Sequence, residues 1–204
     1  MVVAVLLWTM AKQLMRVVAI FVFLTCARIP AAATILQQLT LDEMARKSTS
    51  IVHVTVTGSR EVVRGADVFT LYKFETLETL KSGSTTREVA VPGGVAEGIR
   101  QVVAGAPTLR AGQEYIFFLW TNRSGLTQLM GMSQGLFRVE RTAAGDRQAS
   151  RVAAGEQMVD AAGHAVREET LSMPLTDLRA KVAKALAVAV SAAASGVQGQ
   201  RASK

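Results

Sequence analysis

A mainly β fold, built as a small closed or partly open β-barrel, is the architecture that three features of this sequence predict. Residues 115–120 form an apolar run that is rich in aromatic side chains and too short for a buried helix. All eight aromatic residues after position 34 fall in segments with strand-like patterns. The long segment 67–79 has two partly apolar faces, which favours a curved strand that changes neighbours along its length. We expect about five to seven strands, preceded by a short helix and followed by another.

Residues 1–33 have the composition of a secretory signal peptide. Lys12 and Arg16 precede an apolar run over residues 17–26, and small residues follow up to Ala33. We therefore expect cleavage between Ala33 and Thr34 and a periplasmic or secreted product. The apolar run is about half of the roughly 20 residues that a membrane-spanning helix needs, which argues against a retained anchor.

Two alternatives at this end of the sequence stay open. The apolar residues ahead of Lys12 are unusual for a leader, and a start at Met10 would remove them. Cys26 ends the apolar run and is a possible lipidation site, although the residues before it are large. Without the leader, the chain has no cysteine and its net charge falls from +7 to +4. Packing rather than disulfides must then stabilise the fold.

A short helix is expected over Leu41–Lys47. Thr40 and Glu43 fit the capping-box pattern, in which each side chain satisfies a free backbone N–H at the helix start. Leu41, Met44 and Ala45 share one face by helical spacing. We expect this helix to lie as a lid against the sheet.

Strand periodicity begins at residue 51. Val52, Val54 and Val56 alternate with other residues up to a turn at Gly58, so we expect the valines to face the core. His53 is then expected on the opposite, solvated face, where a lone histidine is not a metal site. Further strands are expected at residues 67–79, 87–91, 115–120, 126–132 and 135–141, with a weak last strand at 148–152. Together, residues 34–152 are interpreted as the barrel domain.

Residues 153–190 are expected to form a polar surface excursion followed by a helix. Pro174 suits the first turn of that helix, and an apolar stripe recurs at helical spacing through residue 186. The stripe consists of Leu175, Leu178, Val182 and Leu186. Residues 191–204 are rich in Ala, Ser and Gly with nothing to bury, so we expect a disordered tail.

The run V-P-G-G…G-I-R-Q-V-V-A-G-A-P-T-L-R-A-G-Q-E-Y-I-F-F-L from Val91, with G-M-S-Q-G-L-F-R-V at 131–139, resembles an uncharacterised family of exported bacterial proteins. The resemblance covers roughly residues 38–190, and at fold level it is similar to oligonucleotide/oligosaccharide-binding (OB) barrels and netrin-like or metalloprotease-inhibitor-like domains. It implies a fold but no chemistry, because most of the residues that carry it are glycines and core residues. These residues are Pro92, Gly93, Gly94, Gly98, Gln101, Gly105, Pro107, Gly112, Glu114, Leu119, Gly131, Gln134, Gly135 and Phe137.

Catalytic and metal-binding motifs are missing from the sequence. It contains no zinc-hydrolase motif, nucleophile elbow, phosphate-binding loop or dinucleotide fingerprint, and it has two histidines. His164, Glu168 and Glu169 have ligand-like spacing, but they lie in a polar segment that we interpret as a solvated face. We therefore expect no enzyme activity, no cofactor and no metal.

The basic composition, with a pI of about 10.1, raises the question of nucleic acid. Single-strand binders expose aromatic side chains along a basic groove, whereas the aromatics here fall in apolar strands. We expect no nucleic-acid partner, and no membrane association after leader cleavage. The arginines outside the leader could meet an acidic polymer or protein surface, but their spread over many segments favours simple solvation. They include Arg87, Arg100, Arg110, Arg123, Arg138 and Arg141.

The glycine-rich loop from Gly93 to Pro107 is the candidate functional segment, because it is far longer than a hairpin connection. The spacing of Val95, Ile99, Val102 and Val103 favours a loop that packs back on the barrel. The residues left to face a partner are Glu97, Arg100 and Gln101.

Two functions remain open for this loop. One is a non-catalytic binding module of the cell envelope, whose partner is an envelope protein or an acidic polysaccharide. The other is an accessory or inhibitor protein of an exported protease. A loop that only caps an open barrel end, without a partner, is a third interpretation.

Overall fold

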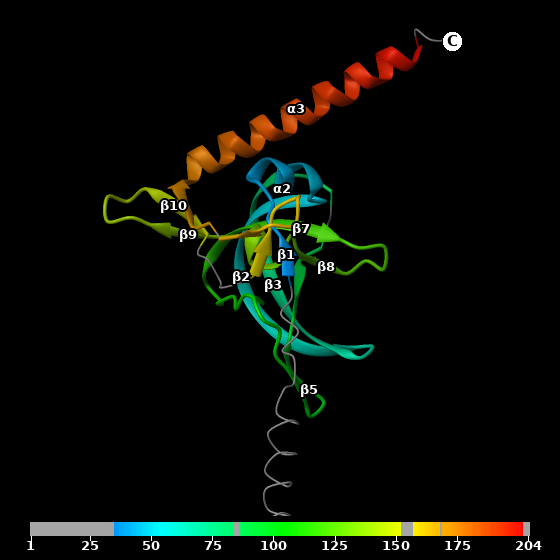
Figure 1. Ribbon diagram of the computed structural model, residues 1–204. Coiled ribbons are helices and arrows are strands. Elements are labelled where there is room, and N and C mark those ends of the chain that lie inside the picture. The colour runs from blue at the N-terminus through cyan, green and yellow to red at the C-terminus, as the bar shows by residue number, and fades with distance from the viewer. Residues whose placement is uncertain (1–34, 84–85, 152–156, 168, 202–204) are drawn as a thin grey trace, which may run out of the picture. The chain divides into compact units, whose positions relative to one another are not determined.

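The computed structural model describes residues 35–83, 86–151, 157–167 and 169–201, with side chains described as far as Ser191. Strands are the main elements of the described residues, which confirms the mainly β class with a helix before and after the main strands (Figure 1). The elements are β1 (Ile35–Gln37), α2 (Leu41–Lys47), β2 (Ser50–Arg64), β3 (Asp67–Lys81), β4 (Glu88–Pro92), β5 (Gly94–Ala96), β6 (Ile99–Gln101), β7 (Glu114–Thr121), β8 (Thr127–Leu129), the 3₁₀ helix η1 (Met132–Gly135), β9 (Leu136–Arg141), β10 (Arg147–Arg151), β11 (Gln157–Val159), β12 (Ala165–Val166), β13 (Leu171–Pro174) and α3 (Leu175–Arg201). The expected leader and its cleavage site lie outside the described residues.

Five strands close into a ring. Their order is β7-β2-β3-β4-β8, and β8 pairs back on β7. The β4–β8 pair is parallel and rests on a single bridge between Ala90 and Gln128, whereas the other four pairs are antiparallel. Strands β9, β10 and β13 extend the sheet outward from β7. The predicted central strand is therefore central: β7 pairs with β2, β8 and β9.

Strands β2 and β3 form a long, bent hairpin, in which β2 runs well beyond the predicted end at residue 57. The pairing register shifts at three places along β2, the last between Val56 and Gly58. Gly58 therefore lies in an irregularity of the strand rather than in a turn, and the turn comes at Gly65, whose φ is +66°. Such irregularities bend a strand. They let β2 pair with β7 through its first half and with β3 along its whole length.

One hydrophobic core lies inside the ring. Val52, Val54 and Val56 contribute to it, as the alternation predicts. Phe117 lies among its aromatic rings, edge-on to Phe74 with 5.6 Å between centroids and stacked on Tyr115 at 5.7 Å. The remaining buried members are Tyr72, Val89, Val91, Leu109, Leu119 and Leu129.

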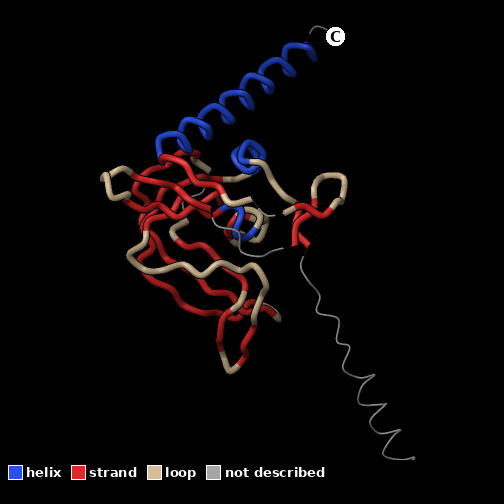
Figure 2. Tube along the Cα trace, turned by 60° about the vertical axis from the view of Figure 1, so that its left-hand side comes forward, coloured by secondary structure: helices blue, strands red, loops and turns tan. Residues whose placement is uncertain are grey.

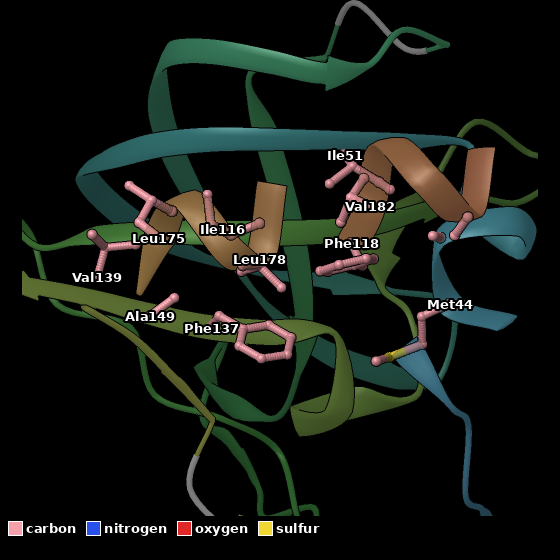
Figure 3. Packing of buried hydrophobic residues seen from close by; sticks show 12 residues of the cluster. Met44, Ile51, Ile116, Phe118, Phe137, Val139, Ala149, Leu175, Leu178 and Val182 are labelled. Carbon is pink, nitrogen blue, oxygen red and sulfur yellow. The ribbon is translucent and has the colours of Figure 1, made fainter. Parts of the chain in front are cut away.

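A second core lies between the outer face of the sheet and the two helices (Figure 3). Phe118 and Phe137 supply its aromatic rings, 5.7 Å apart. Helix α2 has the predicted capping box at Thr40 and Glu43, and it buries Met44 and Ala45 here. The predicted stripe of α3 docks on the same core through Leu175, Leu178 and Val182, with Leu186 partly buried.

The segment before α3 and the length of α3 both differ from expectation. Residues 157–159 pair in parallel with β1 and bury Met158, so part of the predicted surface excursion belongs to a small sheet. Pro174 ends β13 instead of occupying the first turn of the helix. Helix α3 continues to Arg201, past residue 191, where the composition suggested a disordered tail. An Ala-rich sequence has high helix propensity, which favours continuation of the backbone helix without burial.

Candidate functional site

The predicted functional loop contains a small hairpin made of β5 and β6. Glu97 and Gly98 join the two strands with φ values of +51° and +78°. Positive φ at both central residues is typical of the type I′ turn, whose twist matches that of the flanking strands. The hairpin projects from the domain at the end away from α3 in both views (Figures 1 and 2). This loop is therefore a defined structural element.

Hydrogen bonds fix the base of the hairpin to β3. The backbone N–H of Gly93 donates to Val68 O at 2.8 Å, and the Thr70 hydroxyl donates to Gly93 O at 2.9 Å. The Gln101 side chain accepts from the Val68 N–H at 2.6 Å, and its amide donates to Asp67 at 3.4 Å. Gln101 thus ties β6 to β3, and its amide is engaged within the chain. These bonds hold the hairpin in one orientation.

Three of the four apolar side chains that were predicted to pack back on the barrel face solvent, so the prediction is wrong for these three, whereas Val103 is partly buried. Val95, Ile99 and Val102 are 60%, 48% and 82% exposed. Their spacing would place them on one face of a helix, but the chain here forms strands. Leu109, later in the chain, is instead buried in the inner core.

Two of the three predicted contact residues lie on the outside of this hairpin. Glu97 and Arg100 are exposed, and Arg100 stands opposite Val95 in the β5–β6 register. We call Val95, Glu97, Ile99, Arg100 and Val102 together the hairpin surface. It combines three aliphatic side chains with one charge of each sign. Sequence reasoning found its charged residues, whereas it placed its apolar ones in the core.

His53 is buried, which corrects the prediction of a solvated histidine. The side chain is 1% exposed, because helices α2 and α3 cover the face of β2 that the sequence pattern assigned to solvent. Its Nε2 lies 3.0 Å from Glu114 Oε2. An ionised carboxylate only accepts, so a neutral His53 carries its proton on Nε2 and donates it to Glu114. Arg147 reaches the same oxygen at 3.5 Å.

A histidine paired with a glutamate is a common general base, but a substrate cannot reach the imidazole of His53. Beside it lies a polar cavity of about 450 Å³, whose lining includes Glu114 and Arg147 but not His53. A substrate in that cavity would meet the carboxylate and the guanidinium, while the imidazole stays behind them. Geometry comes first in assigning a catalytic base, and here it points to a structural role for His53.

Stability is expected to depend on pH through His53. Burial lowers the pKa of its imidazole below the ordinary value; Glu114 opposes this shift, and Arg179 and Arg147 add to it. Between the folded and unfolded pKa values the unfolded chain binds more protons, so folding is favoured less as the pH falls. The contribution of His53 to the free energy of unfolding is therefore complete above about pH 6.5 and is lost as the pH falls through the pKa of the folded state. The free energy of unfolding changes by at most about 1.4 kcal/mol per pH unit through this group.

Urea unfolding between pH 7.5 and 4.5 checks this expectation. His53→Gln should flatten the curve near pH 6, and His164→Gln, at an exposed histidine, is the comparison variant. Equal curves for the parent and His53→Gln would show that the buried imidazole does not titrate in this range.

The remaining ligand-like cluster, His164 with Glu168 and Glu169, is described only in part. His164 pairs with Asp160 at 3.2 Å in an exposed turn, and Glu168 lies outside the described residues. Within the described part of the chain, no group of three or more His, Cys, Asp or Glu side chains could hold a metal ion. In that same part, no helix has the length and apolarity to cross a bilayer.

Comparison with known proteins yields no match to a family model, a curated protein or a solved structure.

Proposed function

We propose that this protein is an exported, non-catalytic binding module of the cell envelope, which presents the hairpin surface to a protein partner. The observation that carries the proposal is the exposure of Val95, Ile99 and Val102 on a hairpin held in place by hydrogen bonds. Scattered exposed aliphatic residues need no explanation, but this ordered projection exposes apolar groups on both of its faces: Val95 lies beside Arg100 on one face and Ile99 lies on the other. Fixing the hairpin beforehand lowers the entropic cost of binding.

A protein fits this surface better than an acidic polysaccharide does. Recognition of a polyanion rests on several converging cations. The hairpin surface has one cation, Arg100, close in sequence to the acidic Glu97. Its three aliphatic side chains would instead be buried by a protein that contacts both faces of the hairpin, with the two charges at the rim, where they favour orientation and association rate.

The scaffold behind the hairpin is, in this proposal, an OB-like barrel. Numbered along the chain, the strands of the ring run 1-2-3-5-4, with the third and fifth strands parallel. This order, together with a long bent first strand that pairs on both sides, supports the assignment. Most aromatic side chains point into the two cores rather than onto a surface, which argues against stacking on bases.

A second candidate uses the same surface. An accessory or inhibitor of an exported protease must present a segment that holds its shape in the enzyme's cleft, and the type I′ turn with its anchored base meets that need. Purified protein assayed against proteases from the same compartment distinguishes the two candidates. Dose-dependent inhibition that is lost with the hairpin variant below would favour the inhibitor.

The experiment for both candidates replaces the apolar side chains without changing strand propensity. The triple variant Val95→Thr, Ile99→Thr, Val102→Thr should keep the parent's melting temperature and lose about a hundredfold in partner affinity, because each aliphatic group buried contributes roughly 1 kcal/mol or more. The matched control is Leu77→Thr, at an exposed leucine on β3 outside the hairpin.

The partner is captured in living cells by a photo-crosslinking residue at position 99, with position 77 as the control site. A specific cross-linked protein at 99 alone, whose affinity falls in the triple variant, is the expected result. A partner that binds parent and triple variant equally would overturn the proposal.

A further inference from the structure

A cavity of about 250 Å³ opens beside the half-exposed Trp120, at the junction of β4 and β8. We call it the Trp120 cavity. Its other lining residues are Leu36, Ala90, Val91, Pro92, Pro107, Gln128, Leu129, Gly131 and Met132. Pro92 and Pro107 are the residues between which the chain leaves the ring to build the hairpin and then returns. The cavity therefore lies at the base of the same loop.

Trp120 is the one residue of the predicted apolar run that is not buried. Residues 115–119 are covered on both faces of β7, whereas Trp120 is 43% exposed, which corrects its assignment to the core. A half-exposed indole beside an apolar hollow offers a ring face on which a second aromatic group can stack. Because β7 pairs with three strands, this indole is held on a rigid element.

The size and lining of the cavity limit what it can hold. A cavity of about 150 Å³ accommodates a benzene ring, and drug-sized ligands occupy roughly 300–1,000 Å³. The Trp120 cavity falls between these limits, so it suits one ring and is too small for an oligosaccharide or a nucleotide. None of its lining residues is charged, which disfavours an ion. Gln128 supplies one side-chain amide, a suitable partner for the peptide group next to a buried side chain.

We propose that the Trp120 cavity binds one aromatic side chain of the protein partner that the hairpin surface contacts. This inference rests on the proposed function for the source of the ring, while the chemistry of the cavity stands on its own. Aromatic side chains seated in preformed pockets are the residues that contribute most to protein–protein affinity. The loop that carries the hairpin leaves the ring at Pro92 and returns at Pro107, and both prolines line the cavity.

The first test uses a small probe and the protein's own fluorescence. The sequence has two tryptophans, and Trp8 lies in the leader that the exported protein is expected to lose. Protein with Trp8→Phe therefore has Trp120 as its sole indole whether or not the leader is cleaved. N-acetylphenylalaninamide should change the Trp120 emission saturably with a millimolar dissociation constant, and N-acetylalaninamide should not. No saturable change, or an equal change with both amides, would overturn the proposal.

Blocking variants then locate the binding. Gln128→Phe fills the cavity from its half-buried rim. It should weaken binding of N-acetylphenylalaninamide, measured by Trp120 emission, at least tenfold without lowering the melting temperature. If this variant does not fold, Ala90→Leu fills the cavity from the inner side. The triple hairpin variant should respond as the parent does, so failure here is distinguishable from failure of the proposed function. An undiminished response in a folded blocking variant would show that the probe binds elsewhere.

The last measurement decides the source of the ring. Gln128→Phe should weaken capture of the cross-linked partner at least tenfold. If Gln128→Phe no longer binds N-acetylphenylalaninamide but cross-links the partner as the parent does, the cavity binds a free small aromatic molecule. That result would overturn the proposal of a protein side chain.

Discussion

Leu178→Asp is expected to lower the free energy of unfolding by about 4 kcal/mol or more, since it removes a large buried side chain and buries an unpaired carboxylate. Leu178 is fully buried near the start of α3, in the core that contains Phe118 and Phe137. Domains of this size are stable by only about 5–15 kcal/mol, so the variant should be largely unfolded at ordinary temperatures. Denaturant unfolding followed by circular dichroism measures the loss.

The control for this prediction lies on the same helix. Val188→Asp introduces the same charge at a side chain that is 54% exposed, and it should change stability by less than about 0.5 kcal/mol. Similar midpoints for the two variants would show that α3 does not dock on the sheet.

Local signals explain which elements could be predicted from sequence. The capping box of α2 involves residues three apart, and the stripe of α3 follows one helical period, so neither depends on distant chain. The apolar run of β7 needed only its own composition to indicate a strand covered on both faces.

Long-range packing explains what the sequence could not predict. His53 shares its face of β2 with Thr55, and the alternation indicated solvent there; the face is covered because α3, more than a hundred residues later, returns to pack on it. The end of β2 was misplaced for a related reason. Gly58 is an ordinary turn signal, yet pairing with β3 on one side keeps the strand continuous through it.

The candidate site was predicted in position but not in detail. The excess of glycine and the length of the loop were sufficient to mark it, and the left-handed backbone at Gly98 explains one of those glycines. Whether the side chains of Val95 and Ile99 face the core or solvent depends on whether the chain forms a hairpin or a helix-like turn. Two three-residue strands with a two-residue turn are too short for periodicity to reveal.

Gly135, at the end of η1, is a buried glycine at which an added side chain has no room. A Cβ atom there would lie 2.5 Å from Met130 O and 3.0 Å from both Met130 N and Phe118 O. All three are backbone atoms, and the last two form a hydrogen bond of 2.8 Å that joins the chain before η1 to β7. No side-chain rotation can relieve such contacts, so η1 would have to move away from β7.

This displacement would also disturb the N-terminal segment. The neighbouring Gln134 is buried, and its side chain accepts from Leu39 N–H at 2.8 Å and donates to Gln37 O at 3.0 Å. A shift of η1 would lengthen and weaken both bonds, and a typical intramolecular hydrogen bond contributes about 0.5–1.5 kcal/mol to stability.

Gly135→Ala is therefore expected to destabilise the domain by roughly 3 kcal/mol or more, at or beyond the upper end for overpacking, because the clashing atoms are backbone. Gly58→Ala is the matched control: no atom lies within 4 Å of its added Cβ, and alanine in a strand stabilises by about 0.5–1 kcal/mol relative to glycine. Thermal unfolding of both variants measures the difference. A Gly135→Ala protein that melts with the parent would mean that η1 can separate from β7 without loss, and that Gln134 does not hold the N-terminal segment in place.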